Sequence, residues 1–156
     1  GLERFLDEAR ILARLDHPHV IRVRSFFEAH GTAYLVMDYW RGHTLAEAMR
    51  RAAGPLPADR VVPIAIALLD GLDAVHGEGI LHRDIKPDNV YLADPTRGAP
   101  MRPLLLDFGA ARQALGERSR HLSTILTPGF APWEQYLRSG RQGPWTDVYA
   151  VGAMLY

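Results

Sequence analysis

His82-Arg83-Asp84-Ile85-Lys86-Pro87-Asp88-Asn89 is the stretch from which the rest of this sequence can be interpreted. It is an octet that brings an acid, a cation and an amide together around a proline. Pro87 disfavours a helical conformation at the residue before it, so the octet is predicted to form a loop. In a locally extended loop alternate side chains point the same way, which would place Asp84 and Lys86 on one side.

These residue types favour acid–base and metal chemistry. Asp84 can accept a proton while Lys86 neutralises an anion beside it, and Asn89 offers a hard oxygen suited to Mg²⁺. The octet follows a long apolar helical pattern and precedes the apolar run Val90-Tyr91-Leu92. Catalytic groups are often displayed on loops that a rigid scaffold holds in this way.

The composition is that of an ordinary globular domain. The chain has 156 residues, of which 47% are hydrophobic and 23% charged. Its 18 basic and 18 acidic residues balance, and no basic run indicates a nucleic-acid or membrane partner. Cysteine is absent, which excludes disulfides and thiolate metal sites. A cytoplasmic location is compatible with this composition and is expected. No apolar run is long enough for a membrane span.

The N-terminal part is predicted to contain a helix and a hairpin. Apolar residues at helical spacing predict a helix over residues 2–15. Val20–Phe27 and Ala33–Tyr39 are rich in β-branched and aromatic residues and predict two strands, joined by a turn around His30-Gly31.

The remainder is predicted to be mainly helical. Thr44 and Glu47 form a capping-box pattern at the start of a helix that ends near residue 53, after the short connector 40–43. A second helix, from about residue 57 to Gly77, is apolar on nearly every side and is expected to be buried. A short buried strand at 104–106 and a last helix from about Trp145 complete the pattern.

Several motifs together resemble those of protein kinases. The octet resembles the catalytic loop of this family, and Asp107-Phe108-Gly109 resembles its metal-binding motif. Ala131-Pro132-Trp133-Glu134 resembles the family's Ala-Pro-Glu motif with one residue inserted, and Asp147 the helix aspartate that holds the catalytic-loop backbone. The resemblance implies an α+β, two-lobed protein-kinase-like fold, in a fragment without the first N-lobe strands and the last C-lobe helices.

The resemblance also implies a division of the chain. Residues 1–156 would form one partial kinase domain. Residues 1–39 would be what remains of the N-lobe, with its helix and hairpin. Residues 40–156 would be the hinge and a helical C-lobe, truncated within the last helix.

Catalytic and metal-binding roles follow from the resemblance position by position. It implies that Asp84 accepts or orients the substrate hydroxyl proton and that Lys86 steadies the transferring γ-phosphoryl group. Asn89 and Asp107 would hold Mg²⁺. Thr127 resembles the threonine that contacts both the catalytic aspartate and the lysine in serine/threonine kinases.

Other positions resemble the family's nucleotide site. Met37 falls at the gatekeeper, Asp38-Tyr39-Trp40 at the hinge that reads the adenine of ATP, and Tyr91 on the floor of that pocket. Glu8 falls where the family has a helix glutamate that pairs with a strand lysine. Considered without the resemblance, Glu8 is predicted to be an exposed residue of an amphipathic helix.

The function implied is that of an ATP-dependent, bacterial-type serine/threonine protein kinase that phosphorylates protein Ser and Thr hydroxyls. Lys86 favours this class over tyrosine kinases. It is also the only lysine in the chain, and no Gly-x-Gly-x-x-Gly loop is present, so little activity is expected from these 156 residues alone. The alternative is a non-catalytic kinase-like binding or scaffold module. A small-molecule phosphotransferase is disfavoured by the long segment after Asp107.

Overall fold

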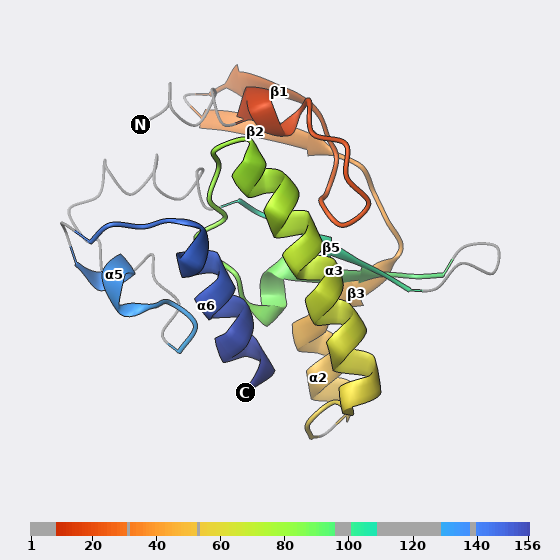
Figure 1. Ribbon diagram of the computed structural model, residues 1–156. Helices are drawn as coiled ribbons and strands as arrows, with labels where there is room; N and C mark the ends of the chain where they lie inside the picture. The colour runs from red at the N-terminus through yellow and green to blue at the C-terminus, as the bar shows by residue number, and fades with distance from the viewer. Residues whose placement is uncertain (1–8, 31, 53, 96–100, 109–128, 138–139) are drawn as a thin grey trace.

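Two small antiparallel sheets and a set of helices form the α+β structure in Figure 1. The computed structural model describes residues 9–30, 32–52, 54–95, 101–108, 129–137 and 140–156. Of the predicted N-terminal helix, residues 9–12 lie within this part and are helical. The assignment of residues 1–39 and 40–156 to two lobes stays a prediction.

The predicted hairpin is confirmed, with different bounds. Strand β1 (Val23–Ala29) pairs with β2 (Thr32–Met37) in an antiparallel register that places Phe27 opposite Tyr34. The strand was predicted to begin at Val20, but Val20 forms a parallel bridge with Leu105 instead. The chain before β1 therefore joins the hairpin to the second sheet.

The second sheet has the strand order β3-β4-β5, with β3 at Gly42–Thr44, β4 at Val90–Ala93 and β5 at Arg102–Leu105. The β4 strand agrees with the predicted apolar run, and β5 begins two residues before the predicted strand 104–106 and ends one residue before its end. The β3 strand was expected to be only a connector. It forms because Gly42, with φ 149°, lets the chain approach the carbonyl of Leu92 closely.

The capping box is confirmed at the start of α2 (Leu45–Ala52). The Thr44 main-chain N–H donates to Glu47 Oε2 at 2.9 Å, and the Glu47 N–H donates to Thr44 Oγ1 at 3.2 Å. These bonds satisfy amide groups that the first turn of a helix leaves without intrahelical partners.

Helix α3 (Ala58–Gly77) packs against α6 (Pro144–Leu155), and a one-turn helix α5 (Trp133–Tyr136) precedes α6 (Figure 1). The α3 helix ends as predicted, with Gly79 at φ 74°. One face of α3 supplies much of the hydrophobic core, through Ile64, Leu68, Leu72 and Val75.

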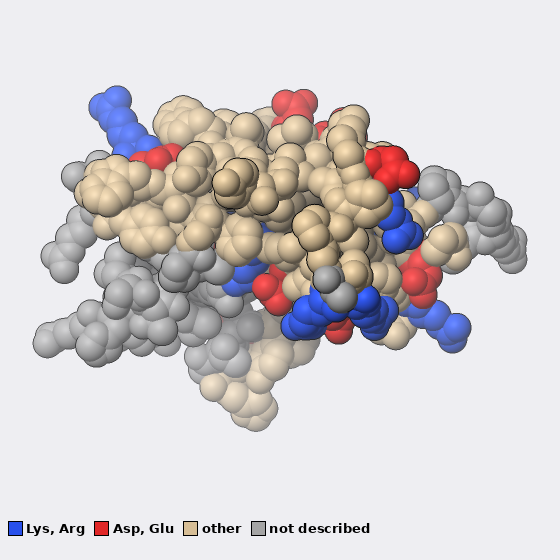
Figure 2. Space-filling model, turned by 90° about the horizontal axis from the view of Figure 1, so that it is seen from below, with Lys and Arg blue, Asp and Glu red and all other residues tan. Residues whose placement is uncertain are grey.

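The prediction that α3 is buried on nearly every side was wrong. Val62, Ile66 and Leu69 are exposed by 53%, 62% and 40%, because no described element packs on that face. Among the described residues, no helix combines the length and apolar character needed to cross a membrane. Figure 2 shows acidic and basic side chains beside one another on one face of the molecule, with broad uncharged areas between them.

Gly42 offers a test of how the second sheet is closed. Gly42→Ala should lower the free energy of unfolding by about 2–4 kcal/mol, because the new methyl group would meet the Leu92 carbonyl at a positive φ. The matched control is Gly152→Ala in α6, where an added Cβ meets nothing within 4 Å. The control should gain up to about 1 kcal/mol. Urea denaturation followed by circular dichroism measures both, and equal stabilities for the two variants would contradict the explanation.

Candidate active site

The octet brings three of the predicted residues together. Lys86 Nζ lies 3.0 Å from Asp84 Oδ2, and Asn89 Nδ2 donates to the same oxygen at 2.8 Å. Asn89 Nδ2 also donates to the Asp84 main-chain oxygen at 2.7 Å. A 3₁₀ turn, Pro87–Asn89, folds the chain back and allows this contact. The prediction that Asp84 and Lys86 lie on the same side of the loop is confirmed by their contact.

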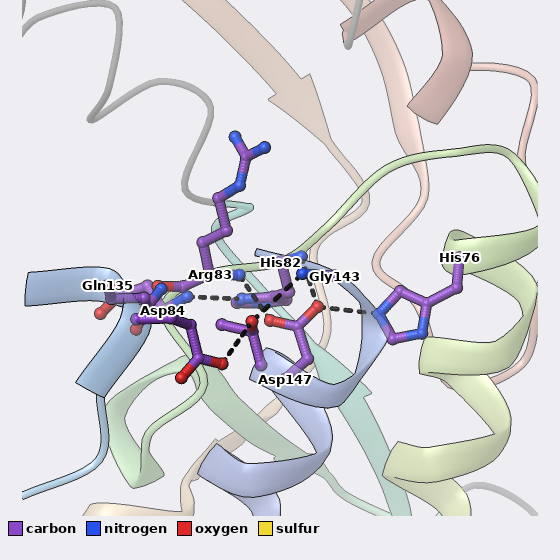
Figure 3. A network of polar contacts seen from close by, with 9 residues as sticks. His76, His82, Arg83, Asp84, Gln135, Gly143 and Asp147 are labelled. Atoms are coloured by element: carbon purple, nitrogen blue, oxygen red, sulfur yellow. Dashed lines mark hydrogen bonds and ion pairs between the residues drawn. The ribbon is translucent and has the colours of Figure 1, made fainter. Parts of the chain in front are cut away.

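Asp147, at the start of α6, binds the main chain of the loop (Figure 3). Its Oδ2 accepts from the His82 main-chain N–H at 2.8 Å, and its Oδ1 accepts from the Arg83 N–H at 2.7 Å. His76 Nε2, from the last turn of α3, lies 2.8 Å from Asp147 Oδ2. The carboxylate is 1% exposed, so α3, α6 and the octet meet at one buried charge.

The hydrogen bonds to Asp147 determine its ionisation. Burial by itself would raise the pKa of this carboxyl, because a charge is poorly solvated inside a protein. The bonds from His76 and from the main-chain N–H groups of Arg83 and His82 outweigh burial and hold the pKa of Asp147 below its usual range. Asp147 is therefore a charged anchor at neutral pH.

The side chain of His82 connects the octet to the end of β5. Its ring is fully buried, and Nε2 lies 2.7 Å from the Leu106 carbonyl oxygen. The ring centroid is 4.7 Å from that of Phe108, with the planes tilted by 44°. Burial lowers the pKa of His82, and the attraction of Asp147 opposes this shift without reversing it. His82 is therefore neutral at physiological pH.

Asp107 lies between the two residues that contact His82. The Leu106 N–H donates to the Asn89 carbonyl at 2.9 Å, so Asp107 follows directly from a residue bonded to the octet. Its main chain is left-handed, with φ 50°, and it is exposed. The predicted metal ligands Asn89 and Asp107 therefore come from segments that are bonded to each other.

The predicted nucleotide residues lie where the hairpin meets the second sheet. The Tyr91 hydroxyl donates to the Trp40 carbonyl at 3.1 Å, and the Arg102 guanidinium carbon lies 5.0 Å from the centre of the Trp40 ring. Burial raises the pKa of Tyr91, which keeps the phenol protonated as a donor. Tyr39 is 88% exposed, and Met37, at the end of β2, is also exposed.

Asp38 is tied to the hairpin. Its N–H donates to the Arg22 carbonyl at 3.1 Å, and Arg24 NH2 donates to its Oδ2 at 3.0 Å. The hydrogen bond from Arg24 holds the pKa of Asp38 below its usual range. Two other predicted site residues, Glu8 and Thr127, lie outside the described residues, as does Gly109.

His76 and Gln135 were not predicted to belong to the site. Gln135 Nε2, in α5, donates to the Arg83 carbonyl at 2.9 Å. Each residue contacts its partner only through the tertiary fold, from more than 50 positions away in the sequence. The one local signal is a polar residue in the last turn of an apolar helix, and it indicates His76 alone.

Asp147→Asn tests the buried anchor. The neutral amide retains one acceptor oxygen and turns an N–H₂ group towards donors, so the variant should lose about 3 kcal/mol of folding free energy. Asp88→Asn, an exposed position in the same loop, is the matched control and should change stability by less than about 0.5 kcal/mol. Urea denaturation measures both, and a loss of similar size in both variants would contradict a special role for Asp147.

The buried neutral His82 predicts a pH dependence. Its folded-state pKa lies below the ordinary value of 6.5, so the unfolded chain binds more protons as pH falls below that value. The stability that His82 contributes is therefore present above pH 6.5 and lost progressively on acidification. His82→Phe should flatten the slope of unfolding free energy between about pH 5 and 6.5. An unchanged slope in the variant would show that other groups cause the dependence.

Comparisons with known proteins match this chain to one family. Residues 2–156 match the protein kinase domain family. Serine/threonine-protein kinase pkn2 of Myxococcus xanthus is 37% identical over 158 residues, which is 99% of this chain and 18% of that protein. Serine/threonine-protein kinase PkaA of Streptomyces coelicolor is 39% identical over 160 residues, covering 98% of this chain and 28% of that protein. The chain therefore spans well under a third of the length of both relatives.

Solved structures show the same fold. The structure titled "PpkA-294 apo form" is 40% identical with a TM-score of 0.77, covering 99% of this chain and 52% of that one. The PknI kinase domain of Mycobacterium tuberculosis is 30% identical with a TM-score of 0.78, covering 99% and 55%. The matched kinase domain and these bacterial relatives place the chain in the protein kinase family, among the bacterial serine/threonine kinases.

Proposed function

We propose that this chain supplies the catalytic-loop half of a serine/threonine protein kinase, which transfers the γ-phosphoryl group of ATP to protein hydroxyls. The observation that carries the proposal is the contact of Lys86 and Asn89 with one carboxylate oxygen of Asp84, at 3.0 and 2.8 Å. It places an acid, a cation and an amide within reach of one reacting group. Phosphoryl transfer depends on this kind of positioning and charge.

The three side chains of the octet would have separate tasks. Asp84, which directly follows the two residues whose N–H groups Asp147 holds, would orient the hydroxyl of the substrate and accept its proton. Lys86 would turn its ammonium group to the transferring phosphoryl group, since an ammonium is a compact charge on a flexible stem. Asn89 would hold Asp84 in place through its amide nitrogen.

The residues present fit a magnesium–nucleotide complex. Both bonds from Asn89 to Asp84 use the amide nitrogen, so Oδ1 is the atom that Asn89 would offer to a cation. The Asp107 carboxylate, on the segment bonded to Asn89, would be the second ligand. Mg²⁺ is commonly bound by one or two protein groups together with phosphates and water, and it neutralises charge that develops on the phosphates.

The adenine of ATP would bind against the junction of hairpin and second sheet. The bond between Tyr91 and Trp40 joins the proposed floor of the pocket to the proposed hinge. Arg24 fixes the neighbouring residue Asp38, so the hinge is held from the hairpin as well. Met37 and Tyr39 complete the set of side chains proposed for the nucleotide. We also infer protein Ser and Thr residues as substrates and a cytoplasmic location.

A non-catalytic kinase-like module is the second candidate. One observation favours it: Lys86 is the only lysine of the chain, so Glu8 has no lysine within these residues with which to pair. Against it, Asp84, Lys86, Asn89 and Asp107 are all retained. We infer that the 156 residues alone have little or no activity.

A graft tests the two candidates. Residues 1–156 would replace the matching segment of pkn2, which provides the surrounding protein. The graft should transfer labelled phosphate from ATP to a generic acceptor, unlike the 156 residues alone. Asp84→Asn in the graft should lower the rate of transfer by about 10²–10⁴-fold. Asp107→Asn should also lower the rate of transfer, because it removes a proposed Mg²⁺ ligand, and a higher Mg²⁺ concentration should partly restore the rate. A graft that folds and binds ATP yet transfers no phosphate would favour the non-catalytic module.

A further inference from the structure

Arg83, the residue before Asp84, is held by side chains at both of its main-chain polar groups. Its φ is 66°, a left-handed conformation that residues other than glycine rarely adopt. The Arg83 N–H donates to Asp147 Oδ1 at 2.7 Å, and its carbonyl accepts from Gln135 Nε2 at 2.9 Å. Figure 3 shows Gln135 and Asp147 reaching the loop from different elements.

The two bonds restrain different parts of the chain. The bond to Asp147 fixes the peptide that enters Arg83, and the bond from Gln135 fixes the peptide that leaves it. The second peptide contains the N–H group of Asp84, so its orientation determines where the Asp84 side chain begins. A strained conformation persists only where its surroundings hold it. Gln135 holds the carbonyl side of this peptide, while its N–H side, at Asp84, donates to His82 Nδ1 at 3.3 Å.

Gln135 is itself positioned by α6. Its neighbour Glu134 accepts a hydrogen bond from Thr146 Oγ1 at 2.9 Å, and Thr146 Oγ1 accepts from the Gly143 N–H at 3.2 Å. Thr146 is 1% exposed. The α5 turn is thus bonded to the N-terminus of α6 through Thr146, which is the residue before Asp147.

The same turn lies beside the proposed catalytic residue. Asp84, Gln135 and Phe130 line one small cavity, together with Thr146 and Asp147. A displacement of α5 from α6 would therefore withdraw Gln135 from the Arg83 carbonyl and also change the surroundings of Asp84.

We propose that Gln135 is a positioning residue that couples the seating of α5 to the geometry of the catalytic loop. When α5 is seated on α6, Gln135 holds the Arg83 carbonyl and so places Asp84. When α5 is displaced, the Asp84 peptide loses the hydrogen bond at its carbonyl side and is held less firmly. The consequence for phosphoryl transfer rests on the proposed function, whereas the main-chain coupling does not.

Hydrogen–deuterium exchange of the 156-residue chain tests the coupling without turnover. Gln135→Leu removes the donor, and Gln135→Glu presents a carboxylate that cannot donate at neutral pH. In both variants we expect the amides of residues 82–84 to exchange at least about tenfold faster, because each variant loses the hydrogen bond to the Arg83 carbonyl. Gln135→Lys retains a donor at similar length and should restore slow exchange. Gln142→Leu, the same change outside the contact, is the matched control.

The outcomes separate the proposal from general loosening. Unchanged exchange in Gln135→Leu, equal acceleration in Gln142→Leu, or failure of Gln135→Lys to restore protection would each overturn it. If Gln135→Leu does not fold, the comparison of Gln135→Glu with Gln135→Lys decides. In the pkn2 graft, Gln135→Leu should lower kcat about tenfold with KM for ATP within about twofold. A graft inactive with Gln135 present would count against the proposed function and leave the exchange result unaffected.

Discussion

The buried carboxylate of Asp147 is the interaction on which the site depends. It is almost inaccessible to solvent, and a charge in that position is stable only where several donors surround it. His76 and the main-chain N–H groups of His82 and Arg83 are those donors. Because they belong to α3 and the octet while Asp147 belongs to α6, satisfying one charge fixes three elements relative to one another. The catalytic loop is thus positioned by its main chain, which leaves its side chains for chemistry.

A second constraint connects this anchor to the proposed metal ligands. The main-chain N–H of His82 donates to Asp147, and the His82 ring contacts the Leu106 carbonyl and the Phe108 ring. Asp107 lies between those two residues and cannot move far without disturbing the ring. A neutral imidazole suits this place, because Nε2 can donate to the Leu106 carbonyl while Nδ1 accepts from the Asp84 N–H at 3.3 Å. Burial of His82 therefore joins the two segments that carry the proposed chemistry.

The sequence predicted those features that depend on local pattern. The capping box at Thr44, the hairpin and the grouping of Asp84 with Lys86 all follow from residues close in the chain, and the structure confirms them. The burial of α3 was predicted wrongly, because an apolar surface does not say whether another element covers it. The start of β1 also differs, since the bridge between Val20 and Leu105 joins residues too distant for a pattern to reveal.

Arg83 shows why the geometry of a site is harder to predict than its residues. Nothing in an arginine favours a positive φ, and neither neighbour in the sequence is a glycine. The conformation exists because Asp147 and Gln135, both more than 50 residues downstream, hold the two peptides around it. Eight consecutive residues are therefore enough to recognise the loop, while contacts from α5 and α6 determine its conformation. A change confined to those helices can alter the position of Asp84 and leave the octet itself intact.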